Sequence, residues 1–153
     1  DALDVFITEL LPLATLLTPN IPEAEILANR KIENVEDIKA AAAAICKLGC
    51  RYVLIKGGHF DGAEKVDYLF EDGKLKTSYR GISVNTRNTH GTGCTLSSAI
   101  TSYLAREMDM NTAIAMAKTY LSGAILAGKD IKIGEGHGPV NHFYEPKSLF
   151  TKS

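Results

Sequence analysis

The sequence lacks an excess of either charge, a long apolar run and a paired set of cysteines. Its 153 residues carry 17 lysines and arginines against 18 aspartates and glutamates, so the formal net charge is −1. The basic residues are scattered, which argues against a nucleic-acid surface, and no apolar stretch approaches the ~20 residues that span a bilayer. With 45% hydrophobic residues, the composition is typical of one soluble globular domain with a real core.

The cysteines exclude two further classes of protein. Cys46, Cys50 and Cys94 are odd in number and have no Cys-x-x-Cys spacing, so the sequence indicates neither a disulfide framework nor a zinc site. Free thiols suit a reducing compartment, and we expect a cytoplasmic protein. Cys46 lies on the apolar side of a helical pattern and Cys50 near a strand start, where a free cysteine usually packs as a small hydrophobe.

The first half of the chain alternates strand and helix patterns. Residues 4–11 predict a helix that Pro12 ends, and the mainly apolar run 14–18 predicts a buried strand. A helical pattern begins at Asn34, and residues 51–56 form a second strand pattern. Because strand, helix and strand follow in that order, we expect the two strands to be parallel, with ligands beyond their carboxyl ends.

The second half begins with a hairpin pattern. Residues 66–70 and 74–79 flank an Asp-Gly step, which favours a tight turn. We therefore expect an antiparallel pair at the edge of a mainly parallel sheet. Two helical patterns follow, over 95–106 and from Asn111, and their apolar stripes predict packing in a core.

A glycine-bearing turn precedes the first of these two helical patterns. Residues 87–94 read Arg-Asn-Thr-His-Gly-Thr-Gly-Cys and run directly into the apolar pattern. Gly91 and Gly93 remove β-carbons that would block a phosphate, and the first turn of a helix leaves backbone N–H groups without partners. A phosphoryl group would be stabilised there. The alternative is an ordinary helix start, which Gly-x-Gly alone does not exclude.

Four segments together resemble one family. The run Asn88 to Cys94 resembles the anion-hole motif of hydroxymethylpyrimidine and phosphomethylpyrimidine kinases, the thiamin-synthesis branch of the ribokinase-like superfamily. Asn20-x-x-Glu23, Lys56-Gly57-Gly58-His59 and the Gly-His-Gly-Pro-Val-Asn run of 136–141 match other motifs of that family, in the same order along the chain. Most relatives end the Gly-x-Gly motif with Asp, whereas Cys94 resembles the pyrimidine-kinase branch.

The resemblance runs from about Leu11 to Phe143 and implies a ribokinase-like α/β fold. Residues 1–153 would form the C-terminal, nucleotide-side portion of a single kinase domain. The first residues hold neither an initiator methionine nor the segments of a signal peptide, so we expect an N-terminal part to be missing.

The activity that the resemblance implies is ATP-dependent phosphorylation of hydroxymethylpyrimidine and then of its monophosphate, which supplies thiamin diphosphate. The implied partners are ATP, Mg²⁺, the small pyrimidine and, for the intact protein, further copies of itself. Nucleic acid and membrane are not expected. The alternatives are a non-catalytic fragment or nucleotide-binding remnant, and a pyridoxal kinase-like enzyme.

The family motif also implies roles for individual residues. The backbone of the Gly-x-Gly turn would stabilise the transferring phosphoryl group, and Cys94 would activate the substrate hydroxyl, since a helix N-terminus favours a thiolate. The alternative for Cys94 is a small packing residue. The implied phosphate or ATP contacts are Gly91, Thr92, Gly93, Asn88, Thr89, Lys56, Asn20 and Glu23.

Two pairs of residues are candidate metal ligands. The resemblance implies that Asn20 and Glu23 organise magnesium and phosphates, and magnesium keeps most of its waters, so both residues could act through water. The alternative is a capping box, with Asn20 as the N-cap and Glu23 as its reciprocal partner. His137 and His142 could suggest another metal, but no third ligand accompanies them in a recognised pattern. A structural or nucleotide-proximal loop is the other interpretation.

Overall fold

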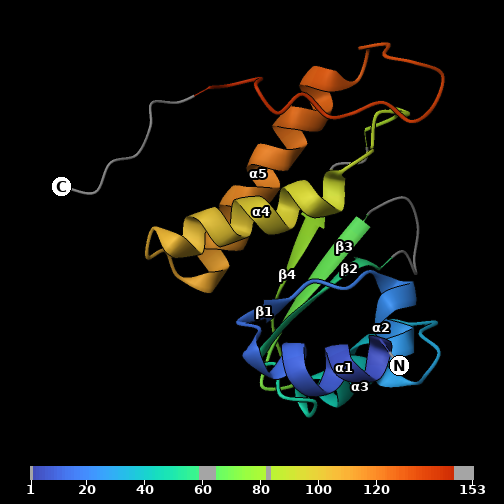
Figure 1. Cartoon of the computed structure of the whole chain (residues 1–153), viewed down its shortest axis with the longest axis vertical. Coiled ribbons are helices and arrows are strands. Elements are labelled where there is room, and N and C mark those ends of the chain that lie inside the picture. Colours follow the sequence, from blue (N-terminus) through green and yellow to red (C-terminus); the bar gives the residue numbers. More distant parts are fainter. Residues whose placement is uncertain (1, 59–64, 82–83, 147–153) are drawn as a thin grey trace. The chain divides into compact units, whose positions relative to one another are not determined.

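The computed structural model describes residues 2–58, 65–81 and 84–146 (Figure 1). The chain divides into two compact units, Asp1–Ser83 and Val84–Ser153. The first unit contains the whole sheet, and the second contains the two longest helices.

The first unit holds a four-stranded sheet of order β1-β2-β3-β4. Its strands are Leu16–Leu17, Tyr52–Gly58, Lys65–Glu71 and Lys74–Gly81. β1 and β2 are parallel, as predicted, and the other two pairings are antiparallel. In the part of the chain described, the sheet is therefore mixed and not mainly parallel. The connections from β2 to β3 and from β3 to β4 are too short for the crossover that a parallel pair needs.

The helical elements of the first unit confirm the predicted order with one change of geometry. They are α1 (Ala2–Val5), a π-helical turn (Phe6–Leu10), a 3₁₀ turn (Leu11–Leu13), α2 (Ile21–Ala28) and α3 (Val35–Cys46). The helix predicted for residues 4–11 is α-helical to Val5 and π-helical from Phe6 to Leu10, so it ends within one residue of the predicted Leu11. Pro12 lies near the start of the 3₁₀ turn, where a missing N–H donor costs no hydrogen bond.

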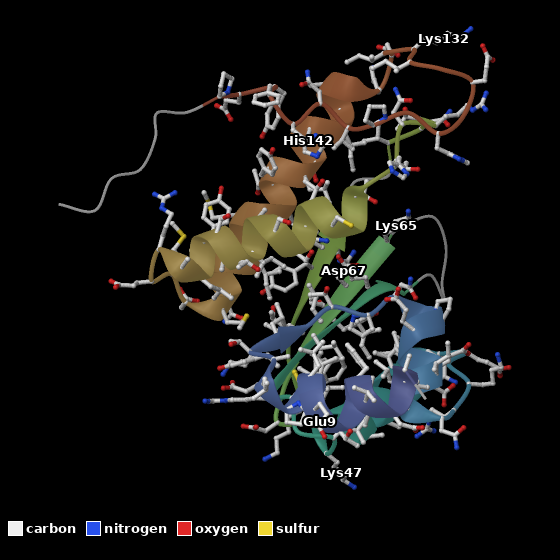
Figure 2. The ribbon with its side chains drawn as sticks, viewed as in Figure 1. Glu9, Lys47, Lys65, Asp67, Lys132 and His142 are labelled. Carbon is white, nitrogen blue, oxygen red and sulfur yellow. The ribbon has the colours of Figure 1, made fainter. Side chains whose placement is uncertain are left out.

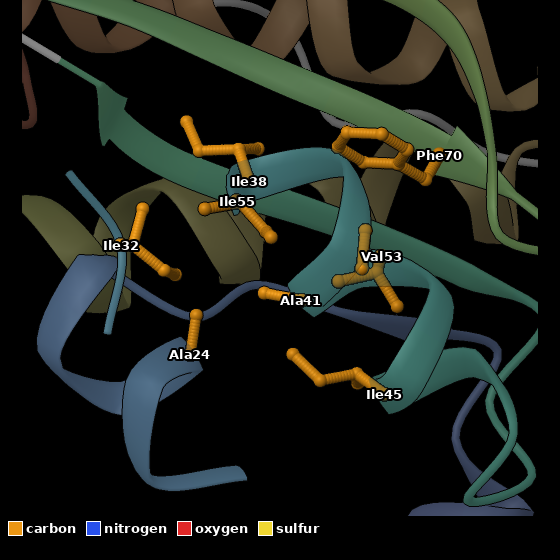
Figure 3. Close-up of a cluster of buried hydrophobic side chains, with 9 residues drawn as sticks. Ala24, Ile32, Ile38, Ala41, Ile45, Val53, Ile55 and Phe70 are labelled. Atoms are coloured by element: carbon orange, nitrogen blue, oxygen red, sulfur yellow. The ribbon is translucent and has the colours of Figure 1, made fainter. Parts of the chain in front are cut away.

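The core of the first unit lies between the sheet and helices α2 and α3 (Figure 3). Ile38 and Ile45 lie on one face of α3, and Ile55 and Phe70 come from the facing strands; all four are completely buried. Burial of one such side chain contributes roughly 1.5–3 kcal/mol. The apolar spacing predicted after Asn34 therefore identified the packed face of this helix, and the Asn34 side chain accepts the Asp37 N–H at 3.0 Å as its N-cap.

The hairpin between β3 and β4 turns at the predicted Asp-Gly step. Asp72 and Gly73 have φ angles of 50° and 76°, both in the left-handed region. This is the geometry of a type I′ turn, which matches the twist of the two strands. A β-carbon at Gly73 would also lie 3.2 Å from Ala43 Cα of α3, so this position favours glycine for two reasons.

The second unit contains α4 (Thr92–Ala105) and α5 (Met110–Gly128), which pack against each other (Figure 1). Leu96 and Ile100 of α4 and Ile114 of α5 are buried. α5 begins one residue before the predicted Asn111, because the Asp109 side chain accepts the Thr112 N–H and so forms the N-cap. After α5 the chain turns back along this helix. Within the described residues, no helix is both long and apolar enough to cross a membrane.

A charged cluster covers part of the sheet in the first unit. Glu71 Oε1 accepts hydrogen bonds from Arg51 Nη2 at 2.7 Å and from the Tyr52 hydroxyl at 2.6 Å. Lys76 Nζ lies 2.8 Å from Glu71 Oε2. Lys76, Tyr52 and Arg51 together lower the pKa of Glu71 from its ordinary 4.5 to about 2. Glu71 therefore stabilises the folded state fully above pH 4.5, and that stabilisation is lost as the pH falls towards 2.

We expect Glu71→Gln to lower the free energy of unfolding at pH 7 and to make it less dependent on pH between about 5 and 2. Urea unfolding across this pH range measures both effects. Glu36→Gln is the matched control, because it removes a carboxylate whose ion pair with Lys39 is exposed and of a kind that contributes little. An unchanged pH dependence in Glu71→Gln would show that the cluster does not stabilise the fold.

Candidate functional site

Three of the predicted site residues lie together at the carboxyl ends of β1 and β2. The Lys56 N–H donates to Pro19 O at 2.8 Å, and Asn20 and Lys56 form an isolated parallel bridge. The pairing of β1 with β2 thus continues past the end of β1. As a result, Lys56 is placed beside the start of α2, which carries Asn20 and Glu23. This edge is where ligands bind in parallel α/β sheets.

Asn20 and Glu23 form the capping box that the sequence predicts. The Glu23 N–H donates to Asn20 Oδ1 at 2.8 Å, and the Asn20 N–H donates to Glu23 Oε2 at 2.8 Å. The box engages one oxygen of each side chain, so Glu23 Oε1 lies outside it. The predicted capping box is therefore present. It leaves one carboxylate oxygen of Glu23 for the other predicted role, which is to organise magnesium.

The side chains at the start of α2 could hold magnesium only if water and phosphate supplied most of its ligands. Within the described ranges, no group of three or more His, Cys, Asp or Glu side chains could hold a metal ion, and this applies equally to His137 and His142. One carboxylate with one amide suits Mg²⁺ when water and phosphate supply its other ligands. Asn20 and Glu23 are exposed and match that arrangement.

Asp67 is a site-adjacent residue that the sequence analysis missed. It lies near the start of β3 and is only 8% exposed (Figure 2). Its Oδ1 accepts the Gly57 N–H at 2.9 Å, next to a register irregularity between Ile55 and Gly58. Gly57 has a φ of +81°, so the strand turns aside directly after Lys56. The available signal was a charged residue two positions before Leu69, on the buried side of the strand.

We expect Asp67→Leu to release the Gly57 amide, since it removes the acceptor of a partly buried N–H. Such a loss costs about 1–3 kcal/mol. Asp67→Asn is the matched control because it retains Oδ1 at the same place. Hydrogen exchange at Gly57, together with urea unfolding, measures the effect; wild-type protection of Gly57 in Asp67→Leu would contradict this role. His59, the last residue of the Lys-Gly-Gly-His match, lies outside the described residues.

The glycine-bearing turn forms the start of α4, as predicted. Gly91 is the N-cap with a φ of 80°, and a β-carbon there would meet nothing within 4 Å. The first helical hydrogen bond runs from the Thr95 N–H to Gly91 O at 2.8 Å. The N–H groups of Gly93 and Cys94 precede that bond and have no acceptor inside the helix. Both residues are exposed.

α4 differs from the other long helices in its capping. Among helices of eight or more residues in the described part of the chain, α2, α3 and α5 have N-cap side chains that accept a backbone N–H, whereas α4 has none. Gly91 has no side chain with which to do so. The positive end of α4 is therefore left to an external acceptor, which is the electrostatic arrangement that binds phosphate.

Asn88 and Thr89, which precede this turn, differ in exposure. Thr89 is exposed, as a phosphate contact would require. Asn88 is only 7% exposed, and its Nδ2 donates to Gly128 O and Ile131 O, each at 2.6 Å. Its side chain thus binds the protein backbone.

The predicted Gly-His-Gly-Pro-Val-Asn loop lies against the same turn. The His90 N–H donates to Gly138 O at 3.2 Å, and His90 and Pro139 form an isolated bridge. His142 Nε2 lies 3.0 Å from the Thr95 hydroxyl, one residue beyond Cys94. The histidine thus has a hydrogen-bonding role in a structural loop, while His137 is exposed.

The predicted site residues thus form two groups. Asn20, Glu23 and Lys56 lie together in the first unit, and residues 88–94 lie together in the second. The first group lies at the end of β1 and the capped start of α2, and the second lies at the start of α4, which has no N-cap side chain.

Comparison with known proteins identifies the class. The sequence profile of phosphomethylpyrimidine kinase matches residues 1–141. The fold resembles that of a pyridoxal kinase from Staphylococcus aureus, with a TM-score of 0.82 at 33% identity, over 93% of this chain and 52% of that one. It also resembles a phosphomethylpyrimidine kinase from Clostridium difficile, with a TM-score of 0.65 at 43% identity, over 80% of this chain and 48% of that one. The ribokinase-like α/β fold is thereby confirmed.

Sequence relatives narrow the class to one family. The hydroxymethylpyrimidine/phosphomethylpyrimidine kinase of Rhizobium meliloti is 45% identical over 94% of this chain and 54% of its own length. The thiamine biosynthesis bifunctional protein ThiED of Geobacter sulfurreducens is 46% identical over 92% of this chain and 28% of its own length. The chain belongs to the phosphomethylpyrimidine kinase family. It spans about half the length of the single-function relatives that it matches.

Proposed function

We propose that this chain is the nucleotide-side part of a kinase that transfers a phosphoryl group from ATP to hydroxymethylpyrimidine and then to its monophosphate, in thiamin diphosphate synthesis. The observation that carries this proposal is the uncapped start of α4, with Cys94 in its first turn. The family, whose named members carry out this chemistry in thiamin biosynthesis, supplies the substrate class.

The start of α4 suits the needs of phosphoryl transfer. This reaction depends mainly on positioning and on stabilising charge that spreads over the phosphoryl oxygens. The N–H groups of Gly93 and Cys94 are fixed donors that need no reorganisation when that charge develops. Solved structures of the S. aureus pyridoxal kinase include complexes with ADP and with AMP-PCP, so a structural relative binds this class of nucleotide.

Lys56, Asn20 and Glu23 would act on the nucleotide phosphates. The Lys56 ammonium would neutralise negative charge, and its backbone is held between Pro19 and the Gly57–Asp67 hydrogen bond. Glu23 and Asn20 would hold Mg²⁺ through water without losing the capping box. When bound, Mg²⁺ would shield the charge of the phosphates.

Cys94 would accept the proton of the substrate hydroxyl. It is exposed in the first turn of α4, next to the amides that would bind the phosphoryl group. A proton acceptor at that place can meet the hydroxyl that attacks the phosphorus. An exposed free thiol also suits a reducing cytoplasm, where we place the protein. Self-association of the intact protein stays a prediction.

A second candidate is pyridoxal phosphorylation, which the structural likeness to pyridoxal kinase favours. Two observations rank it lower. Identity to the named hydroxymethylpyrimidine/phosphomethylpyrimidine kinases is 37–45%, against 33–35% to the S. aureus pyridoxal kinase. Cys94 also stands where the wider superfamily resemblance implies Asp.

The proposal predicts a specific product. The complete reading frame that encodes this chain, supplied with ATP and Mg²⁺, should convert hydroxymethylpyrimidine to its mono- and diphosphate, as mass spectrometry would show. Pyridoxal under the same conditions tests the second candidate. If the folded protein forms neither the monophosphate nor the diphosphate above a control without enzyme, the assignment is wrong.

Cys94→Ala should lower kcat by about 10²–10⁴-fold, the usual contribution of a positioned base, while nucleotide affinity is retained, because the backbone amides stay in place. Cys94→Asp should be more active than Cys94→Ala, since a carboxylate can also accept the proton. Ser98→Ala is the matched control: Ser98 is an exposed small residue one turn further along α4. Wild-type turnover in Cys94→Ala would leave Cys94 as a packing residue.

A further inference from the structure

Asn88 joins two segments that are 40 or more residues apart in sequence. Its side-chain amide has two N–H donors, and each meets a backbone carbonyl: Gly128 O at the end of α5 and Ile131 O just beyond it, both at 2.6 Å. Helix ends leave carbonyl groups without intrahelical partners. Gly128 O also accepts the Ile131 N–H at 3.1 Å. The Asn88 amide adds a second hydrogen bond there and ties the C-terminal end of α5 to the glycine-bearing turn.

A third segment touches the Asn88 side chain from another direction. A β-carbon placed on Gly138 would overlap Asn88 Oδ1 and would lie 2.8 Å from its Cγ. All three of the atoms nearest to that β-carbon belong to the Asn88 side chain. Gly138 does not have a left-handed φ, so the close approach of Asn88 is what excludes a larger residue there.

The segment that begins at Gly138 continues along both helices of the second unit. We call residues 138–142 the strap. Gly138 O accepts the His90 N–H at 3.2 Å, and the Asn141 N–H donates to Ala124 O of α5 at 3.0 Å. At its far end, His142 Nε2 lies 3.0 Å from the hydroxyl of Thr95, a residue only 8% exposed. Figure 2 marks His142 on this segment.

The strap and Asn88 thus hold the start of α4 from both sides. Asn88 and His90 precede the open amides of Gly93 and Cys94, and Thr95 follows them. Asn88 donates to Ile131 O just after α5. His90 donates to Gly138 O of the strap, and the Thr95 hydroxyl is hydrogen-bonded to His142 of the strap. The amides themselves remain outside this network of contacts.

We propose that Asn88 is a positioning residue, which locks the start of α4 to the end of α5 and to the strap so that the Gly93 and Cys94 amides keep the geometry for a phosphoryl group. This inference rests on the proposed function. It replaces the direct phosphate contact expected for Asn88, because that contact would require the side chain to give up two hydrogen bonds in a buried place.

The chemistry of the side chain explains why asparagine suits this position. Two carbonyls need two donors on one planar group, which an amide supplies and a carboxylate or hydroxyl does not. A small displacement of catalytic groups has large kinetic effects: 1 Å can cost on the order of 100-fold in rate. Positioning by Asn88 therefore has a measurable consequence although its side chain touches no substrate.

Three variants test the lock. Asn88→Ala removes both donors, and Gly138→Ala pushes a methyl group into the Asn88 amide from the other side. The double variant Asn88→Ala/Gly138→Ala has no steric clash, because the Asn88 side-chain atoms that a β-carbon at Gly138 would overlap are absent. Gly136→Ala is the matched control, since a β-carbon at Gly136 in the same loop would meet nothing within 4 Å.

The first readout is hydrogen exchange, which does not depend on activity. The amides of His90, Thr95 and Asn141 donate hydrogen bonds at the start of α4 and along the strap. They should exchange faster in Asn88→Ala and in Gly138→Ala than in the wild type or Gly136→Ala. The double variant should match Asn88→Ala alone. Wild-type exchange in both single variants, or additive effects in the double variant, would overturn the proposal.

The second readout is turnover by the protein of the complete reading frame. Both single variants should lose about 10- to 100-fold in kcat, with a smaller change in KM for ATP, because the amides act on charge that develops during transfer. Faster exchange with wild-type kcat would make Asn88 merely structural and overturn the positioning role. If the wild-type protein transfers no phosphate, the proposed function fails, and exchange of the His90 and Thr95 amides alone decides whether Asn88 positions the helix start.

Discussion

Every α-helix begins with backbone N–H groups that have no acceptor within the helix, and this constraint shapes the start of α2 in the first unit and of α4 in the second. At α2 the need is met internally, since Asn20 and Glu23 cap each other's amides. At α4 it is not met by any N-cap side chain, because the N-cap is Gly91. The same lack of acceptors is therefore met by a capping box in one unit and leaves the Gly93 and Cys94 amides open in the other.

Holding an uncapped helix start in place requires contacts from elsewhere in the fold. In the second unit these come from the end of α5 and from the strap, through Asn88, His90 and Thr95. In the first unit, Asp67 and Pro19 fix the backbone around Lys56. Residues outside the predicted set of site residues thus hold the backbone around Lys56 and around the start of α4.

The sequence predicted much of this architecture because the signals are local. The Asp72-Gly73 turn needs left-handed φ angles, and Asn34 and Asn20 have side chains suited to capping the residues three positions on. The apolar spacing of α3 was likewise enough to identify Ile38 and Ile45 as core residues. The mainly parallel sheet was wrong for the part described, since short connections after β2 produce antiparallel pairs.

The sequence by itself determined the start of α4 and the open amides of Gly93 and Cys94, because glycine content and helix periodicity act over a few residues. Only the tertiary structure decided what Asn88 and Asp67 do. Asn88 has partners at Gly128 and Ile131, and Asp67 holds Gly57 from another strand. Such pairings depend on which distant segments the packed core brings together, and no local pattern encodes that choice.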